Sequence, residues 1–157
     1  MRIGDGFVMY YVAMTREPNA CAVAYAVSTD LVHWQDRGPA LTQPVSLEVG
    51  QAMMESPCVV EANGRWHLFY TQARGLNHAV SDSPFAFDSP RFFCSTHASE
   101  VFSDEEGGWL ISNVNKAVGY SHTRGNERFA SDDLSLARLV FVGDEPQLRP
   151  ILESNSL

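Results

Sequence analysis

The sequence is poor in cysteine, in positive charge and in long apolar runs, and each shortage excludes a class of protein. Its three cysteines, Cys21, Cys58 and Cys94, are odd in number and have no CxxC spacing, which favours buried thiols in a reducing compartment over disulfides or a zinc site. Only 11 Lys and Arg residues accompany 19 Asp and Glu residues, and a net charge of -8 argues against a nucleic-acid partner. The longest apolar run, Phe7–Met14, is too short to span a bilayer. No charged leader precedes a cleavable apolar segment, so we expect a soluble, cytoplasmic protein with no membrane partner.

Helical patterns are nearly absent as well. No window of helical length keeps apolar positions at helical spacing without a glycine or proline break. Short segments rich in β-branched and aromatic residues recur instead, each bounded by turn formers. They are Phe7–Met14, Cys21–Val27, Pro57–Glu61, Arg65–Thr71 and Leu139–Val142. The pattern predicts an all-β fold, and a chain of 157 residues that is 45% hydrophobic can bury a sizeable core within one domain.

Turn sequences separate these segments. Glu61–Gly64 contains Asn-Gly, which readily takes the positive φ angles of a tight hairpin. We therefore predict a hairpin there, and another at Asp104–Gly108. The chain begins close to a third turn, Gly4–Gly6.

The strand segments also repeat. Tyr25–Trp34 aligns without gaps on His78–Phe87, about 50 residues further along the chain, and Ala130–Leu134 forms a fainter third copy. The strands that precede the three copies are equivalent too; they are Phe7–Met14, Arg65–Thr71 and Gly108–Val114. A unit of this length, made of four short antiparallel strands, is typical of a β-propeller blade, whose faces are covered by the neighbouring blades.

The repeat predicts about three blades of four antiparallel strands, at residues 1–45, 50–95 and 96–143, followed by an extended or disordered tail at 144–157. The first blade is expected to lack its innermost strand, because the chain starts in the turn Gly4–Gly6. A generic β-sandwich is the alternative fold, and the repeat disfavours it because sandwiches do not require one.

Three motifs follow one another at blade spacing. They are Ala26–Trp34 with Gly38–Leu41, then Glu55–Pro57 with Asn63–Thr71, then His97–Val101 with Gly107–Ser112. The first resembles an S-x-D-L-x-x-W…G signature, the second an E-S-P or E-C-P motif that opens a later blade, and the third the opening strand of the blade after that. Together, over residues 5–143, they resemble the five-bladed propeller glycoside hydrolases of families 43 and 32.

The resemblance implies a funnel at the propeller axis that holds an Asp base or nucleophile, a second Asp that orients, and a Glu proton donor. One carboxyl group must protonate the departing glycosidic oxygen while another activates water or attacks carbon. Glu55 matches the proton donor by its motif and by its place at the head of an innermost strand. Neither Asp has a match, because Asp5, Asp30 and Asp36 fall in turn or outer-strand positions and the expected strands would lie upstream of residue 5.

Three further residues are candidates for substrate binding. Glu100 would lie near the axis by the same reasoning as Glu55, and for both residues a solvated, inert carboxylate is the alternative. His97 either faces the channel or is a hydrogen-bonded structural histidine. Trp34 either stacks on a sugar ring or packs between blades. His33, like Trp34, either packs between blades or stacks on a sugar ring. His67, His78 and His122 lack metal-ligand spacing, so we predict no metal and no cofactor.

Three blades do not close a ring, so two apolar blade faces need a cover. We expect a homo-oligomer, with a homodimer that completes the propeller, or a piece of a longer enzyme. The predicted function is a glycoside hydrolase-like propeller protein that binds a plant-type oligosaccharide or polysaccharide and is either degenerate or active only as an oligomer. The alternative is a non-catalytic scaffold that binds protein partners. A second carboxylate within roughly 5 to 10 Å of Glu55 would favour an enzyme.

Overall fold

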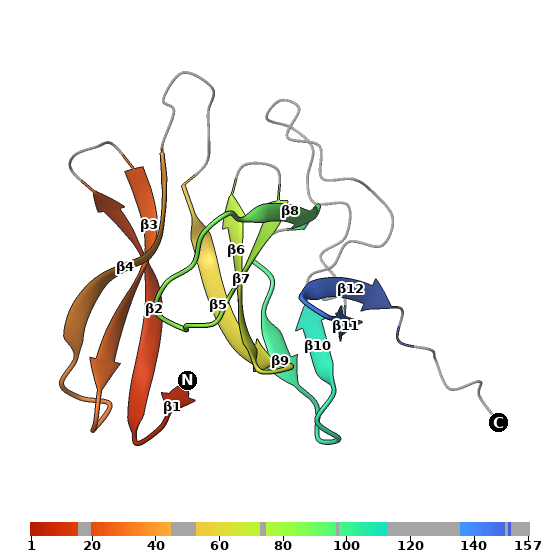
Figure 1. Ribbon diagram of the computed structural model, residues 1–157, viewed down its shortest axis with the longest axis horizontal. Coiled ribbons are helices and arrows are strands. Elements are labelled where there is room, and N and C mark those ends of the chain that lie inside the picture. Colours follow the sequence, from red (N-terminus) through yellow and green to blue (C-terminus); the bar gives the residue numbers. More distant parts are fainter. Residues whose placement is uncertain are drawn as a thin grey trace.

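The computed structural model describes residues 1–15, 20–44, 53–72, 75–96, 98–112, 136–149 and 151. These residues form twelve strands and contain no helix. The strands make three four-stranded sheets that follow one another along the chain and stand side by side (Figure 1).

Each sheet is an antiparallel meander in which strand order follows chain order. The first contains β1 (Arg2–Ile3), β2 (Gly6–Thr15), β3 (Ala20–Ser28) and β4 (Gln35–Pro44). The second contains β5 (Glu55–Ala62), β6 (Arg65–Gln72), β7 (Gly75–Ser81) and β8 (Arg91–Cys94). The third contains β9 (Val101–Ser103), β10 (Trp109–Ser112), β11 (Leu136–Val142) and β12 (Glu145–Arg149). This is the strand pattern of propeller blades, and it confirms the predicted fold class.

The first sheet has an innermost strand after all, which corrects the expectation that it was missing. Arg2 pairs with Phe7 and Ile3 with Gly6 across a short turn. The Met1 amino group donates to the Val8 carbonyl at 2.8 Å, and the Val8 N–H donates to the Met1 carbonyl at 2.9 Å. These two bonds extend the pairing by one residue, which allows a strand of two residues to form.

The C-terminal end of the third sheet also differs from the expectation. Glu145–Arg149 were placed in an extended or disordered tail, but they form β12, which pairs with β11 from Val142–Glu145 to Arg138–Arg149. The third sheet therefore reaches beyond residue 143. The faint repeat copy Ala130–Leu134 and His122 lie outside the described residues, and β11 begins only after that copy.

Both predicted hairpin turns are confirmed. Asn63 and Gly64 have φ angles of 54° and 73°, and Ala62 pairs with Arg65 around them, as in a tight two-residue hairpin. In the second turn the Gly108 N–H donates to Asp104 Oδ1 at 2.6 Å, and the Asp104 N–H donates to the Gly108 carbonyl at 2.8 Å.

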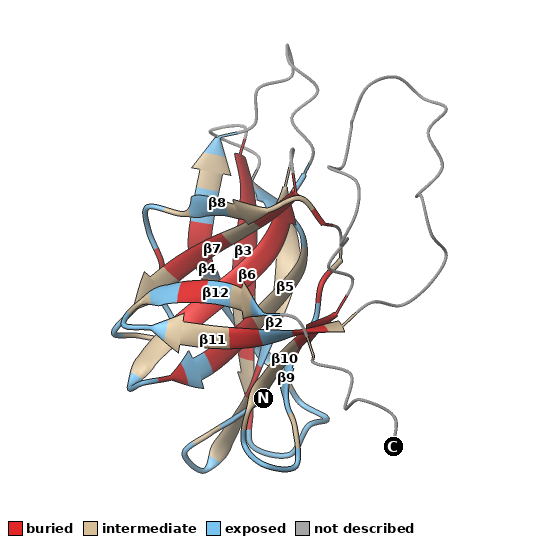
Figure 2. Cartoon of the chain, turned by 90° about the vertical axis from the view of Figure 1, so that its right-hand side faces the viewer, coloured by how far each residue is buried: buried red, intermediate tan, exposed pale blue. Residues whose placement is uncertain are grey.

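The second sheet is buried on both faces because it lies between the other two. Figure 2 shows buried residues concentrated on its central strands and on β3. Alternate side chains of a strand point to opposite faces, and in β6 Leu68 and Tyr70 pack toward the first sheet while Phe69 packs toward the third. The first interface is completed by Cys21, Val23, Ala40, Leu41, Met54, Val59, Ala79 and Phe87, and the second by Val60, Leu76, Val101, Ile111, Ala137 and Leu139.

The outward faces of the first and third sheets keep apolar side chains exposed. Met9 alternates with Tyr10, which packs toward the second sheet, and Phe102 alternates with Val101 in the same way. Met9 is 42% exposed and Phe102 is 41% exposed. Each outer sheet therefore keeps an apolar side chain exposed on its outward face.

Candidate functional site

The innermost strands of the second and third sheets lie next to each other. β5 contacts β9, and the Cys58 thiol on β5 donates to the Val101 carbonyl on β9 at 3.4 Å. Figure 1 shows that both strands run in the same direction. Glu55 is the first residue of β5, and Glu100 immediately precedes β9. The two glutamates thus occupy equivalent ends of neighbouring inner strands.

Glu55 lies at a bulge in its strand. It pairs with Thr71, and the register then shifts before Cys58 pairs with Phe69. Ser56, between them, has a φ of 48°, although a residue before proline normally takes an extended conformation. A residue other than glycine is strained at a positive φ angle, and such strained positions cluster at functional sites. The Glu55 side chain is exposed at the head of β5.

The segment before β9 is fastened beside the strand partner of Glu55. The Ala98 N–H donates to Thr71 Oγ1 at 3.0 Å, and Thr71 is buried. The hydroxyls of Thr96 and Ser99 are 3.2 Å apart and also buried. Ala98 has a φ of 51°, so this approach to Glu100, like the exit from Glu55, includes a left-handed residue.

Glu100 is fixed through its backbone. Its N–H donates to Ser112 Oγ at 3.0 Å, and the Ser112 N–H donates to its carbonyl at 2.9 Å. The side chain of Glu100 is exposed, whereas Ser112 is buried. Glu55 and Glu100 are therefore both exposed glutamates opposite a residue with a buried hydroxyl, Thr71 and Ser112. The Ser112 hydroxyl accepts from the Glu100 N–H, whereas the Thr71 hydroxyl accepts from the Ala98 N–H.

The pKa of the Cys58 thiol is shifted by its surroundings. Burial raises its pKa above the usual range, the contact with the Val101 carbonyl opposes this, the charge of Glu100 raises it further, and the amino terminus lowers it. The Cys58 thiol therefore stays protonated near neutral pH.

The three aspartates considered from the sequence stand in turns or on an outer strand. Asp5 lies in the turn between β1 and β2. Asp30 lies in the turn after β3 and accepts hydrogen bonds from Ser28 and from the Val32 and His33 backbone. Asp36 is on β4, where Tyr11 donates to it at 2.6 Å. These three carboxylates stand in the turn or outer-strand positions that the sequence indicated.

The other predicted substrate-binding residues are separated from this edge. Trp34 stands before β4, the outermost strand of its sheet, and its indole N–H donates to the Leu31 carbonyl at 3.1 Å. In the first sheet β2 and β3 lie between β4 and the innermost strand β1. Trp34 therefore lies at the outer edge of its sheet, whereas Glu55 is on the innermost strand of the next sheet, and the structure does not bring the two together. His97 lies outside the described residues. The sequence analysis missed the two hydroxyl partners, whose signal is a Ser or Thr near the end of each second strand.

Within the described ranges no three His, Cys, Asp or Glu side chains are grouped as metal ligands. Nor do those ranges contain a helix with the length and apolarity needed to cross a membrane.

The fold is that of β-propeller blades, as found in the family 43 and family 32 glycoside hydrolases. An exo-β-1,3-galactanase from Clostridium thermocellum superposes with a TM-score of 0.64 at 20% identity, over 89% of this chain and 33% of that one. A thermostable family 43 glycoside hydrolase gives 0.63 at 15% identity, over 98% and 59%. A sucrose-6-phosphate hydrolase from Lactobacillus gasseri gives 0.69 at 14% identity, over 96% and 35%.

The chain spans between a third and three fifths of the length of these three structures, as an incomplete propeller does. No family model matches the sequence, and no curated protein matches it. The likeness is therefore one of fold.

Proposed function

We propose that the chain is a glycoside hydrolase-like propeller segment that binds a plant-type oligosaccharide or polysaccharide at the edge where β5 and β9 begin. The observation that carries the proposal is the repeated arrangement of Glu55 beside Thr71 and Glu100 beside Ser112. Ionised carboxylates accept hydrogen bonds from sugar hydroxyls, and bonds to charged acceptors are the stronger ones. Two exposed glutamates on neighbouring inner strands suit a chain of sugar rings better than a single small anion.

Glu55 is the proton donor in this proposal, and hydrolysis requires a second carboxyl group. Asp5, Asp30 and Asp36 stand in turn or outer-strand positions. In this proposal the chain binds glycan at the edge that carries Glu55 and Glu100, and cleavage depends on a second copy that completes the ring. The exposed apolar faces around Met9 and Phe102 support a homodimer in which two part-rings complete each other.

A non-catalytic scaffold is the second candidate function. The same exposed faces favour it, because apolar sheet faces are typical docking surfaces for protein partners. The two candidates differ in whether glycan binding depends on the glutamates.

Binding measurements on single variants test the proposal. Xylo-oligosaccharides and arabino-oligosaccharides are titrated calorimetrically into the full chain and into the Glu55→Gln, Glu100→Gln and Glu61→Gln variants. Glu61 is the matched control, since it is exposed on the same strand but at the opposite end. We expect the first two substitutions to weaken binding by about tenfold, the worth of one charge-assisted hydrogen bond, and the third to leave it unchanged.

Nitrophenyl glycoside hydrolysis by wild type and Glu55→Gln then tests the proton-donor role. Equal and measurable rates in the two proteins would remove Glu55 from the proton-donor role, and equal glycan affinities in all four proteins would overturn the proposal. Absence of glycan binding together with a mass above that of the monomer favours the scaffold.

A further inference from the structure

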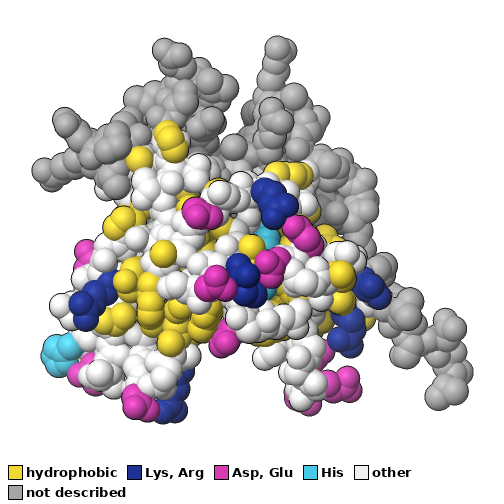
Figure 3. Space-filling model, viewed as in Figure 1, with side chains coloured by type: hydrophobic (Ala, Val, Ile, Leu, Met, Phe, Trp, Pro, Cys, Tyr) yellow, Lys and Arg dark blue, Asp and Glu magenta, His cyan; other side chains and the backbone are white. Residues whose placement is uncertain are grey.

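A separate cavity of about 360 Å³ lies at the end of the first sheet, where its hairpins meet the connection between β7 and β8. Its volume is within the usual range of ligand sites, about 300–1,000 Å³. Ile3, Val8, Val27 and Phe85 make its apolar lining. Figure 3 shows hydrophobic side chains gathered over the first sheet, with Lys or Arg and His atoms at the left-hand border. Neither Glu55 nor Glu100 lines the cavity.

Phe85 is held in place while remaining accessible. Its ring stacks on Tyr25 with centroids 5.0 Å apart and an interplanar angle of 27°. The segment that carries it is tied to the first sheet, because the Tyr10 hydroxyl donates to the Pro84 carbonyl at 2.7 Å. Phe85 is nevertheless 36% exposed. A fixed, accessible aromatic ring is a platform for the apolar face of another ring.

His33 presents a hydrogen-bond acceptor at the rim. Its Nδ1 lies 2.8 Å from Asp30 Oδ2. The pKa of Asp30 lies below its usual range, chiefly because of this contact and of the His33 and Val32 backbone N–H groups. Because a carboxylate only accepts, Nδ1 of His33 carries the proton of this contact, and Nε2 on the other side of the ring is left for a ligand.

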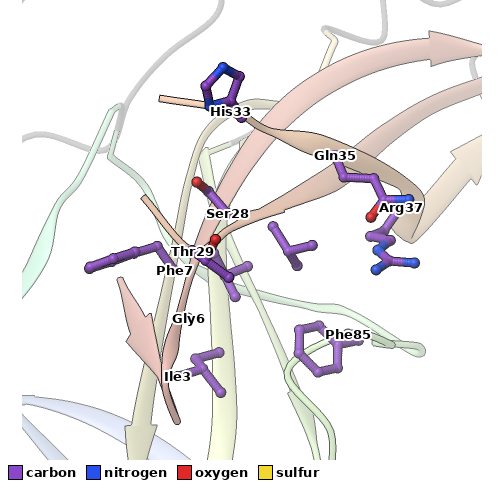
Figure 4. A pocket seen from close by; sticks show the side chains of 11 residues that line it. Ile3, Gly6, Phe7, Ser28, Thr29, His33, Gln35, Arg37 and Phe85 are labelled. Atoms are coloured by element: carbon purple, nitrogen blue, oxygen red, sulfur yellow. The ribbon is translucent and has the colours of Figure 1, made fainter. Parts of the chain in front are cut away.

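Arg37 supplies the positive charge of the cavity. It is exposed, and the structure records no ion pair for it among the described residues, in a chain whose net charge is -8. Figure 4 shows Gln35, Arg37 and Phe85 along one side of the cavity. A guanidinium group binds a carboxylate through two parallel hydrogen bonds. The side that carries the aromatic ring thus also carries an amide and an uncompensated cation.

We propose that this cavity binds a sugar ring that carries a carboxylate, as in a uronic acid residue. The face of the ring packs on Phe85 and Ile3, the carboxylate pairs with Arg37, and the hydroxyls bond to Gln35 and to Nε2 of His33. This site goes beyond the proposed function, because it uses none of the residues at the β5 and β9 edge. It would let the protein distinguish acidic from neutral glycans.

Saturation-transfer NMR with D-glucuronate and D-glucose as probes tests the proposal on the full chain. We expect glucuronate to bind more tightly than glucose at millimolar concentrations. Arg37→Gln should weaken glucuronate binding by about tenfold and leave glucose unchanged, the loss expected for one charged pair. Phe85→Leu should weaken both sugars. Arg149→Gln removes the same charge from an exposed position on β12 and should change neither.

Glu55→Gln separates this site from the proposed glycan edge, because it should leave glucuronate binding intact whether or not it affects oligosaccharide binding. No glucuronate binding, equal affinity for the two sugars, or equal losses in Arg37→Gln and Arg149→Gln would each overturn the proposal. Because Arg37 is exposed, its substitution does not endanger the fold.

Discussion

His67 Nδ1 lies 2.9 Å from His78 Nε2, in the face of the second sheet that packs against the third. The two residues are 0% and 6% exposed, and their rings are nearly parallel, with centroids 5.2 Å apart. Phe141 from β11 packs on His67 with centroids 4.2 Å apart. A hydrogen bond between two ring nitrogens needs one donor and one neutral acceptor, so the pair cannot be doubly charged without losing it.

Burial lowers the pKa of both histidines. For His78 it falls from 6.5 to about 3, with burial as the main cause and the charges of His67 and Arg91 adding to it. For His67, burial is opposed by the Ala62 backbone and by Asp144, while Arg65 acts in the same direction as burial. The unfolded chain therefore binds more protons than the folded chain between about pH 3 and pH 6.5.

We predict that the free energy of unfolding falls as the pH drops from 6.5 toward 3. Within that window the free energy of unfolding changes by about 1.4 kcal/mol per pH unit through His78 alone. Above pH 6.5 His78 makes no contribution to the pH dependence. Urea denaturation at several pH values, followed by tryptophan fluorescence, measures the slope.

Carboxylates also destabilise the fold in acid, so the test compares slopes between variants. His78→Gln keeps a polar partner for His67 and should flatten the pH dependence. His33→Gln, in an exposed turn of the first sheet, should not. An unchanged slope in His78→Gln would contradict the assignment.

A close backbone approach at Gly75 makes a second prediction. Gly75 has a φ of 139°, and a Cβ atom there would stand 2.5 Å from the Cys94 carbonyl oxygen. The Ser95 Cα and the Thr96 nitrogen, both at 3.1 Å, leave no room on the other sides. Gly75→Ala should cost at least about 2 kcal/mol in the free energy of unfolding, because backbone atoms must move.

Gly4→Ala is the matched control, since Gly4 also has a positive φ, 57°, but has nothing within 4 Å of its Cβ position. It should cost only about 1 kcal/mol, the conformational term alone. Equal shifts of the two melting curves would mean that the contact with Cys94 does not matter.

Local sequence patterns predicted the parts of this fold that local interactions determine. The Asn63-Gly64 turn and the repeated strands around it need only neighbouring residues, and both are present. The two strands that were expected to be absent have no such signal, because Arg2–Ile3 is too short to show alternation and Glu145–Arg149 contains Pro146. Proline is tolerated there because β12 is the edge strand of its sheet, where a missing N–H costs no ladder bond.

The features of the candidate site were also predictable only where a local sequence pattern marks them. The position of Glu55 at the head of a strand followed from its motif, whereas the bond from Ala98 to Thr71 joins residues 27 apart and leaves no local pattern. The pairing of His67 with His78 is likewise a contact between strands. Trp34 was a candidate because of its residue type, but only the strand order reveals that it stands on the far side of its sheet from β1.

The hydroxyl of Tyr10 makes a third prediction, because it ties the first sheet to the connection between β7 and β8. It donates to the Pro84 carbonyl at 2.7 Å, and desolvation by burial raises the pKa of Tyr10 above its usual range. Tyr10→Phe should lower the free energy of unfolding by about 1 kcal/mol, as expected for a partly buried hydrogen bond. It should also weaken glucuronate binding, since Phe85 is next to Pro84.

Tyr11→Phe is the control for that variant. Its hydroxyl bonds to Asp36 on the exposed side of the first sheet, so its loss should change stability less and glucuronate binding not at all. If the two substitutions have equal effects, the Tyr10 bond does not hold the connection in place.

The exposed faces of the outer sheets make the last prediction. If two copies complete a ring, the outward face of the first sheet in one copy meets the outward face of the third sheet in the other, and a two-fold axis gives both contacts at once. A charge on either face then disrupts two interfaces. Met9→Lys or Phe102→Lys should shift the mass in light scattering from dimer to monomer at micromolar concentration. Leu31→Lys, in an exposed turn, adds the same charge and should not. A wild-type chain that is monomeric under these conditions, or a dimer that survives both face substitutions, contradicts ring completion by a second copy.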